Sequence, residues 1–455
     1  MQGITERISN YIAQLSWEKL PENVLEQTKL FIADYYAACI AGYRINTILN
    51  KNILSIFEKM GGLEESTILF SDIKLPAGNA AFLNAIYAHG ADMDDGNRKA
   101  AGHIGAHVIS AVFALAETIN AKWSDVFVAI NAGYDLFNRV VGAAQPGLYN
   151  KGLHSTGIGG GIACAAACAK LLGLGADGIY NAISLGAVQS SGLILIDESG
   201  QGCKPINPAN AARTGILSAQ LAQLGTYSPR NPLESKKGWF NAFTSEVDEH
   251  ALLNGMGQTF TICESYLKLY PTCRHTHCCI EAALSIREKL LSNGFSLSSI
   301  KSITVFIYPS AIKSAGQIPY PQSVEEAKFS IHYCVAVALV RGKFGLEELN
   351  VQKCHEVNDF TKKITLVEDV DMEKRDQGIR GAKLRVEIDN GVYFEQQILI
   401  PRGEPRKPLD WQDIVQKTID CAAEMYDMER VHMLIENVRG IDYEEPFRHC
   451  CPRHL

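Results

Sequence analysis

The sequence predicts a mainly α-helical protein with a second, α+β part that contains an antiparallel sheet. Residues 1 to about 260 repeat helical patterns and hold few alternating β-branched runs, whereas segments rich in Val, Ile and Thr begin after about residue 262. Helical periodicity then returns from about residue 406. The 455 residues suffice for two large domains or about three average ones.

Helices are expected throughout the first part. An amphipathic helix covers most of residues 1–20, and Ala and Gly, rather than Leu, occupy many of the later helix faces. Because small side chains let helix axes approach closely, this composition predicts a compact, layered bundle. The later helical patterns cover residues 16–43, 79–91, 108–119, 124–144 and 162–187, and a further helix is expected from about Ala209.

Strands and helices alternate in the second part. Strands are expected at residues 302–309 and 362–369 and twice within 382–401, where Asp389-Asn390-Gly391 is a hairpin-turn signal between two antiparallel strands. Helical patterns at 278–293 and 324–344 lie between the strands in sequence. The final helical stretch, 408–441, opens with Asp410 as its expected N-cap.

Composition excludes several classes of function. A net charge of -7 gives no basic surface for nucleic acid. The most apolar stretch, 161–176, is interrupted by Lys170, so we expect no membrane span, and the N-terminus does not resemble a secretory signal. The 13 cysteines follow no disulfide framework, which favours reduced thiols and a cytoplasmic location.

The first candidate site is HGADMDDGNRKAAGHIGAH, residues 89–107. An EF-hand calcium loop is excluded, because counting from Asp92 the Gly is fifth and His103 takes the twelfth position. Zinc binding by His103 and His107 lacks the Glu of an HExxH motif. A His in a Gly-bearing loop at a helix start, near carboxylates, suits proton transfer at neutral pH. The alternative is a solvated loop between two helices.

The second candidate site, residues 152–175, combines His154 with Ser155, Thr156 and a run of Gly. Free backbone N–H groups at a helix start can bind a substrate carboxylate. No strand precedes the glycines and their spacing is not GxGxxG, so a dinucleotide site is not expected. The alternative is that these glycines only allow close helix packing.

Two cationic segments follow. Residues 200–215 place a single Lys204 among turn residues, where a solvated lysine is the alternative. Residues 266–284 carry Lys268, Arg274 and His277 among cysteines, but no CxxC pair supports zinc. A cationic cluster before a helix favours an anion site.

Taken in order, these segments resemble the MmgE/PrpD family of 2-methylcitrate dehydratases, cis-aconitate decarboxylases and an iminodisuccinate epimerase. EAKFSIHY at 326–333 matches a further family segment, and the resemblance spans nearly the whole chain. The matching motifs are AxxxDxDD with HxxA and then ALAE (Ala88, Asp92, Asp94, Asp95, His103, Ala106, 114–117), GxHxT with KLLGL (Gly152, His154, Thr156, 170–174), KPxxxxNAA (Lys204, Pro205, Asn210, Ala211, Ala212) and KxYPxCxxxH (Lys268, Tyr270, Pro271, Cys273, His277).

The resemblance implies a two-domain MmgE/PrpD fold. Residues 1–263 form a large helical domain to which 403–455 return, and residues 264–402 form a smaller, inserted, lid-like α+β domain. The active site lies between them, in a homodimer, without a metal or an organic cofactor.

The implied reaction moves a proton at a carbon beside a carboxylate of a small di- or tricarboxylic acid. We expect a hydro-lyase of the 2-methylcitrate dehydratase type, with a cis-aconitate-type decarboxylase, a dicarboxylate epimerase and a catalytically silent dimeric binding protein as alternatives. The expected catalytic residues are His103 for proton transfer, Asp92 to orient it, His154 and Lys204, and the expected substrate-binding residues are Lys268, Arg274, His277 and Thr156.

The chain departs from the family pattern in the same segments. Ile104 stands where a Pro usually follows the His, and Gly96 where a Thr is frequent. Residues 97–99 form an unusual basic insertion, and Asn207 stands where many members have His. The extra Arg and Lys suit either a more acidic substrate or a solvated loop.

Overall fold

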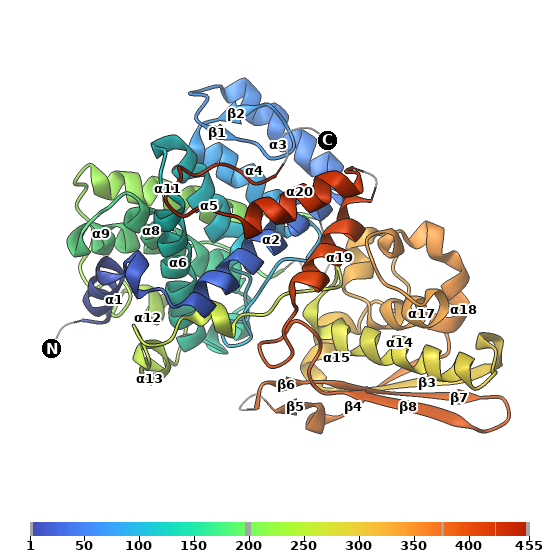
Figure 1. Cartoon of the computed structure of the whole chain (residues 1–455). Helices are drawn as coiled ribbons and strands as arrows, with labels where there is room; N and C mark the ends of the chain where they lie inside the picture. The colour runs from blue at the N-terminus through green and yellow to red at the C-terminus, as the bar shows by residue number, and fades with distance from the viewer. Residues whose placement is uncertain (1–2, 196–201, 375–376, 424, 452–455) are drawn as a thin grey trace.

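The computed structural model describes residues 3–195, 202–374, 377–423 and 425–451, so Gly200 and Gln201 of the Lys204 segment lie outside the described residues. Figure 1 shows a large helical body beside a smaller part that carries a sheet, with the two C-terminal helices lying against the helical body. The mainly helical fold with an α+β part is therefore confirmed.

The helical body matches the expected segments with small shifts at the ends. The pattern at 162–187 is two helices, α8 and α9, separated at Leu172–Gly175. The helices are α1 (Ile4–Gln14), α2 (Glu22–Ile45), α3 (Thr47–Met60), α4 (Ala77–Gly90), α5 (Gly105–Ile119), α6 (Trp123–Ala143), α7 (Gly147–Asn150), α8 (Ser155–Leu171), α9 (Ala176–Ala187), α11 (Ile206–Gln223), α12 (Trp239–Phe243) and α13 (Glu249–Leu253). The short strands β1 (Ser66–Thr67) and β2 (Lys74–Leu75) pair beside α4.

The glycine-rich helix α8 packs against α5, α6, α9 and α11. A Cβ atom added to Gly160 would lie 2.8 Å from Cβ of Ala211 on α11, and one added to Gly215 would lie 2.1 Å from Cβ of Cys164 on α8. Any larger side chain would push the two helices apart. The glycine run therefore serves close helix packing, as the alternative interpretation of this segment stated.

The sheet has the order β4-β3-β7-β8, with β3 (Ile300–Ile307), β4 (Ile364–Glu368), β7 (Ala382–Ile388) and β8 (Tyr393–Ile398). The antiparallel prediction is right for β3–β7 and β7–β8, but wrong for β3–β4, which pair in parallel. The helical crossover between β3 and β4 returns the chain to the start of the sheet, so β4 runs in the same direction as β3. The crossover helices are α15 (Pro309–Ala315), α16 (Val324–Lys328), α17 (Ile331–Arg341) and α18 (Asn358–Thr361).

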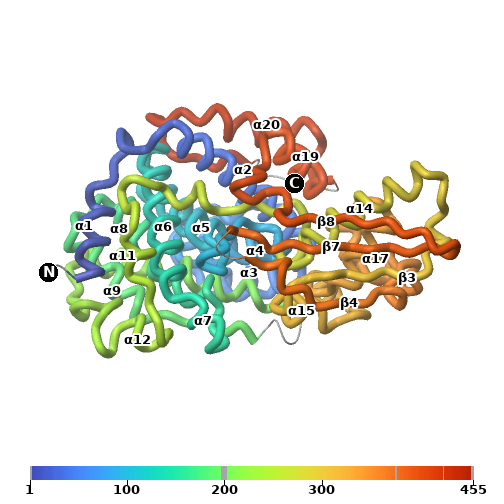
Figure 2. The backbone as a smooth tube through the Cα atoms, turned by 90° about the horizontal axis from the view of Figure 1, so that it is seen from below, coloured from blue at the N-terminus to red at the C-terminus, as the bar shows by residue number. Residues whose placement is uncertain are grey.

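Helices α14 (His277–Ser292) and α17 lie together on one face of this sheet, as Figure 2 shows. Side chains of β7 alternate between buried and more exposed positions, as expected for a sheet covered on one face. The expected turn joins β7 to β8, with Gly391 at φ +81°. A second pair, β5 (Glu373–Lys374) and β6 (Ile379–Arg380), lies outside the main sheet.

Two clusters of buried apolar side chains underlie the two parts. One runs from Ile8 to Leu267 and resumes at Leu409, and the other runs from Cys278 to Ile388. The residues of the first cluster that follow Leu409 lie mostly on α19 (Trp411–Ala422) and α20 (Met428–Arg439), which pack against α2. Asp410 caps α19 through a capping box with Asp413. We propose from these cores that residues 264–402 form an inserted unit.

In the described part of the chain, no helix has the length and apolar character needed to cross a membrane.

Candidate active site

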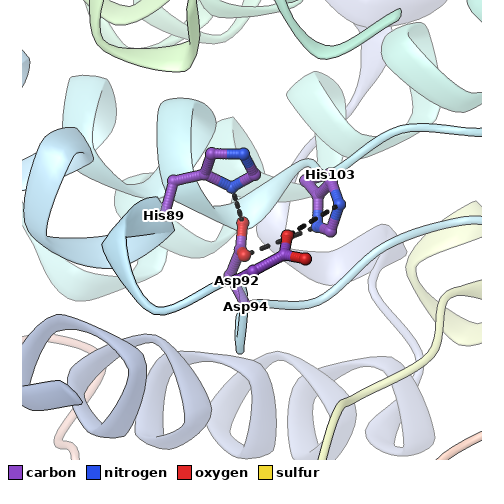
Figure 3. A group of neighbouring side chains, drawn as sticks. All are labelled: His89, Asp92, Asp94 and His103. Atoms are coloured by element: carbon purple, nitrogen blue, oxygen red, sulfur yellow. Dashed lines mark hydrogen bonds and ion pairs between the residues drawn. The ribbon is translucent and has the colours of Figure 1, made fainter. Parts of the chain in front are cut away.

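The segment between α4 and α5 carries several residues of the candidate site. Helix α4 ends at Gly90, and residues 91–104 carry Asp92, Asp94 and His103 before α5 begins. Asp92 adopts φ +52°, a left-handed conformation that Asp tolerates better than most residues. This turn brings the side chains of Asp92, Asp94 and His103 close to one another, beside His89, in a largely buried region (Figure 3).

Three buried lysines bind the backbone at the carboxyl end of α4. Lys328 donates to the Gly90 carbonyl at 2.9 Å, Lys268 to that of Asp92 at 2.8 Å, and Lys417 to that of Met93 at 2.9 Å. Carbonyls at a helix end lack intrahelical partners, and cations there are stabilised by the helix dipole. Lys268 lies in the linker before α14, Lys328 on α16 and Lys417 on α19, so both parts of the protein hold the segment.

The Asp92 carboxylate is bound by two lysines. Its Oδ1 lies 2.7 Å from Lys204 Nζ and 3.3 Å from Lys268 Nζ, and its Oδ2 has no hydrogen-bond partner among the described residues. Burial alone would raise the pKa of Asp92, but Lys204 and Lys268 outweigh it and hold the pKa well below its usual range. Burial lowers the pKa of Lys268, although Asp92 opposes that shift.

His103 presents a basic nitrogen next to this cluster. Its Nδ1 lies 2.8 Å from the Asp95 carbonyl oxygen, which can only accept, so Nδ1 carries the hydrogen and Nε2 holds the lone pair. Nε2 lies 3.8 Å from Asp92 Oδ1. Burial lowers the pKa of His103 to about 3, so the ring is neutral near pH 7 and Nε2 can accept a proton.

The groups that contact Nδ1 and the backbone of His103 do not include Asp92, which the sequence led us to expect there. Besides the Asp95 carbonyl, Asp94 Oδ1 lies 3.4 Å from Nδ1, and Thr156 Oγ1 accepts the His103 backbone N–H at 3.0 Å. Asp92, at 3.8 Å, is beyond hydrogen-bond distance of the ring. The buried Thr156 hydroxyl therefore favours a role in positioning His103 over the expected contact with substrate.

His89 is a member of the site that sequence reasoning missed. Its Nδ1 lies 2.8 Å from Asp94 Oδ2, its Nε2 is buried without a partner among the described residues, and its ring centroid lies 4.7 Å from that of His103. Its place near the end of an apolar helix made it indistinguishable from a core residue by pattern alone. The one available signal was its position three residues before Asp92.

Four side chains here could also be considered as metal ligands. Ligand atoms of His89, Asp92, Asp94 and His103 lie within 4.8 Å of one another. However, Lys204 and Lys268 already neutralise Asp92, and a divalent cation would have to be placed beside both ammonium groups. This charge arrangement suits an anionic ligand better than a metal ion.

His154 lies near His89 and within range of the charge of Lys204. Its ring centroid is 6.1 Å from that of His89, and its Nδ1 lies 2.9 Å from Asn207 Nδ2. Burial first, and then the charge of Lys204, holds the pKa of His154 well below its usual range. His154 is therefore a second neutral imidazole in the site.

Arg274 and His277 contact each other rather than an open space. His277 is buried, its Nδ1 lies 2.9 Å from Arg274 Nη1, and its Nε2 lies 3.3 Å from the Thr272 carbonyl oxygen. Burial and then Arg274 hold the pKa of His277 well below its usual range. Arg274 also binds Glu404 Oε1 at 2.7 Å.

The basic insertion has structural partners. Arg98 binds Glu404 Oε2 at 2.8 Å, so Glu404 lies between two arginines, and Lys99 forms an exposed ion pair with Glu264 at 2.7 Å. Of the two interpretations given by the sequence, neither a solvated Arg98 nor an Arg98 free for substrate fits this geometry. The structure thus brings together Asp92, His103, His154, Lys204 and Lys268, and Thr156 binds the His103 backbone. Arg274 and His277 contact each other, and no hydrogen bond or ion pair joins them to this cluster among the described residues.

Comparison with protein families decides the relationship. Residues 6–250 match the MmgE/PrpD N-terminal domain, and residues 270–442 match the MmgE/PrpD C-terminal domain. The chain belongs to the MmgE/PrpD family. The resemblance found in the sequence is thereby confirmed for most of the chain.

Relatives of this chain align with it over different lengths. A cis-aconitate decarboxylase of Aspergillus terreus is 27% identical over 97% of this chain and 93% of its own length. The human cis-aconitate decarboxylase is 27% identical over 97% of this chain and 92% of its own length. The 2-methylcitrate dehydratase of Escherichia coli K12 is 24% identical over 57% of this chain and 55% of its own length. These relatives are lyases, in agreement with the lyase expected from the sequence.

Proposed function

We propose that this MmgE/PrpD protein is a cofactor-independent lyase that moves a proton at a carbon beside a carboxylate of a small di- or tricarboxylic acid. The observation that carries the proposal is the position of the neutral His103 Nε2 beside the cluster of Asp92, Lys204 and Lys268. A base next to fixed cations is what a weak carbon acid requires.

The charges of the site suit such a substrate. A carbon beside a carboxylate becomes acidic enough only if the negative charge that develops on the carboxylate is stabilised. Lys204 and the neutral ring of His154 are the groups we assign to this stabilisation, and Lys268 keeps Asp92 ionised and in place. Because these groups are largely buried, their electrostatic interactions are screened less than at the surface.

Among the family reactions, decarboxylation of an unsaturated tricarboxylate such as cis-aconitate is the first candidate. It is supported by the cis-aconitate decarboxylases that align over nearly the full chain. In this reaction the bond to one carboxylate breaks, CO2 leaves, and the electron pair moves through the double bond to a carbon beside another carboxylate. That carbon then takes a proton from His103 Nε2, which the charges of the bound substrate must first make basic enough to be protonated.

Dehydration of a 2-methylcitrate-like acid is the second candidate. It is supported by the partial alignment to the 2-methylcitrate dehydratase and by the neutral state of His103, which can accept the proton directly. Here His103 removes the proton beside a carboxylate, and the hydroxyl on the neighbouring carbon takes up this proton from His103 and leaves as water.

A substrate screen tests the proposal. The purified protein is incubated with cis-aconitate, citrate, 2-methylcitrate, isocitrate and iminodisuccinate, and CO2 release, alkene formation and optical rotation are followed. We expect turnover of at least one acid, and a loss of about 100-fold or more in His103→Gln. The exposed His355→Gln serves as the control. Failure of every acid would favour a silent binding protein on the same fold.

We also propose that the protein is a homodimer. Several apolar side chains on and near α9 and α11 are exposed, and one of them, Leu217, lines a groove of about 610 Å³ together with Gly78 and Arg213. The exposed apolar side chains are Val188, Leu193, Leu195, Ile206 and Leu217. Light scattering should give twice the chain mass, and Leu217→Glu should lower it.

The proposed compartment is the cytoplasm. All 13 cysteines are free in the described part of the chain, and most are buried, as is typical of reduced thiols. Fractionation of cells of the source organism checks the location.

A further inference from the structure

We propose that Asn207 fixes His154 in one tautomer, in which Nδ1 accepts a hydrogen bond and Nε2–H is left to donate to a carboxylate of the substrate. Asn207 is thus a positioning residue. The inference rests on the proposed function for the identity of the anion, but the tautomer itself can be observed without substrate.

Two contacts of one amide group establish the direction of the hydrogen bond. The Asn207 side-chain atom that lies 2.9 Å from His154 Nδ1 also lies 3.2 Å from the Leu193 carbonyl oxygen. A backbone carbonyl can only accept, so this atom is the NH2 nitrogen and the amide cannot be turned over. Nδ1 of His154 must then be the acceptor, and the hydrogen of the neutral ring is on Nε2.

Backbone contacts hold both partners in place. The His154 N–H donates to the Gly192 carbonyl at 3.2 Å, and the Ile194 N–H donates to the Gly152 carbonyl at 3.0 Å, so Leu193 lies in a segment paired with the one that precedes α8. The Asn207 N–H donates to the Lys204 carbonyl at 3.2 Å. One turn at the start of α11 therefore supplies Lys204 and the residue that orients His154.

The surroundings keep the ring neutral. His154 is buried, and the charged or titratable groups that act on it are Lys204, His89, His103 and Asp92. Of these groups only Asp92 favours an imidazolium, while Lys204 opposes it. A neutral N–H donor can stabilise charge that develops on a carboxylate without bringing a full charge of its own.

The direct test is the ¹⁵N spectrum of the imidazole nitrogens in substrate-free enzyme labelled with [¹⁵N]histidine. The signals of His154 are assigned as those lost in His154→Gln. In the wild type we expect an unprotonated Nδ1 and a protonated Nε2. A protonated Nδ1 in the wild type would overturn the proposal, and this result requires no other variant to fold.

Two substitutions of similar size test the function of the contact. Asn207→Asp places a carboxylate that accepts from Nδ1, so we expect a protonated Nδ1, a raised pKa of His154 and a fall in kcat/KM of about 10- to 100-fold. Asn207→Leu removes the donor without adding charge, and we expect mixed tautomers and a smaller fall. The control is Asn241→Asp, an exposed amide that donates to the Ser235 carbonyl.

The outcomes separate this inference from the proposed function. If the spectrum of Asn207→Asp changes as expected but no acid is turned over by the wild type, the tautomer assignment stands and the lyase proposal fails. If an acid is turned over and Asn207→Asp keeps the wild-type kcat/KM and pH profile, the positioning role of Asn207 is wrong.

Discussion

At the scale of single residues, three histidines of the site are each held through one ring nitrogen. His103 donates to the Asp95 carbonyl, His89 contacts Asp94, and His154 accepts from Asn207. The hydrogen bond made by one ring nitrogen decides whether the other nitrogen can donate or accept a proton. Motif spacing indicated His103 and His154, but not their tautomers, because it does not place a backbone carbonyl of the same loop beside His103 or an amide of another segment beside His154.

The pH dependence of kcat separates the two candidate reactions. Burial lowers the pKa of His103 to about 3 in the substrate-free site, and the negative charges of a bound substrate raise it. Decarboxylation needs His103 protonated, so kcat should fall by about tenfold per unit as pH rises above the raised pKa. Dehydration needs the neutral ring, so its kcat should fall as pH decreases instead. Rate measurements between pH 4 and 9 decide, and a kcat for CO2 release that rises with pH would contradict the role of His103 as donor.

At the scale of elements, the segments that connect the two parts are tied together next to the site. The Gly96 and Tyr266 backbones bind each other at 3.0 and 2.7 Å, and the Leu267 N–H donates to the Gly403 carbonyl at 3.0 Å. Glu404 joins Arg98 to Arg274 across the same segments. The basic insertion is thus part of the connection between the helical body and the inserted unit.

We expect Glu404→Gln to destabilise the protein by about 3 kcal/mol, because it leaves two largely buried arginines without a counter-charge. The free energy of unfolding in urea measures the effect. The control is Glu387→Gln, whose exposed pair with Lys301 should contribute at most about 1 kcal/mol. Equal losses in the two variants would show that Glu404 does not hold the segments together.

The sequence predicted where the helices and strands lie better than it predicted which of them contact each other. Hydrophobic periodicity located the helices, the hairpin turn at Gly391 and the Asp410 cap, since these depend on local geometry. The parallel pairing of β3 with β4 depends on the path of the crossover, which periodicity does not encode. Lys328 and Lys417 were missed as members of the site for the same reason, since each is buried against a carbonyl far away in sequence.

At the scale of the whole molecule, the site lies where the two parts meet, and its groups are withdrawn from water. His107, His154 and His277 are buried and His103 is largely buried, and all four are neutral, with lowered pKa values that follow first from burial. Burial raises the pKa of Asp34 to about 6 and that of Asp95 well above its usual range. These two carboxyl groups lower the free energy of unfolding as pH rises, whereas the histidines lower it as pH falls. The stability of the whole fold is therefore coupled to pH.

His107 provides a clean test of this coupling. Both of its ring nitrogens lack partners among the described residues, and burial lowers its pKa to about 3. Since the unfolded chain takes up this proton near pH 6.5, His107 contributes stability above about pH 6.5 that is lost as pH falls toward 3. His107→Leu should reduce the slope of unfolding free energy against pH in that window by up to about 1.4 kcal/mol per unit. The control is the exposed His432→Leu, and an unchanged slope in His107→Leu would be contrary to expectation.

Turnover of cis-aconitate in deuterated water tests the central claim, proton transfer by His103 at a carbon beside a carboxylate, most directly. NMR of the product should show one deuterium at a carbon next to a remaining carboxylate, with CO2 released in equal amount and both signals lost in His103→Gln. Product formed without deuterium at that carbon, or undiminished in His103→Gln, would contradict the claim.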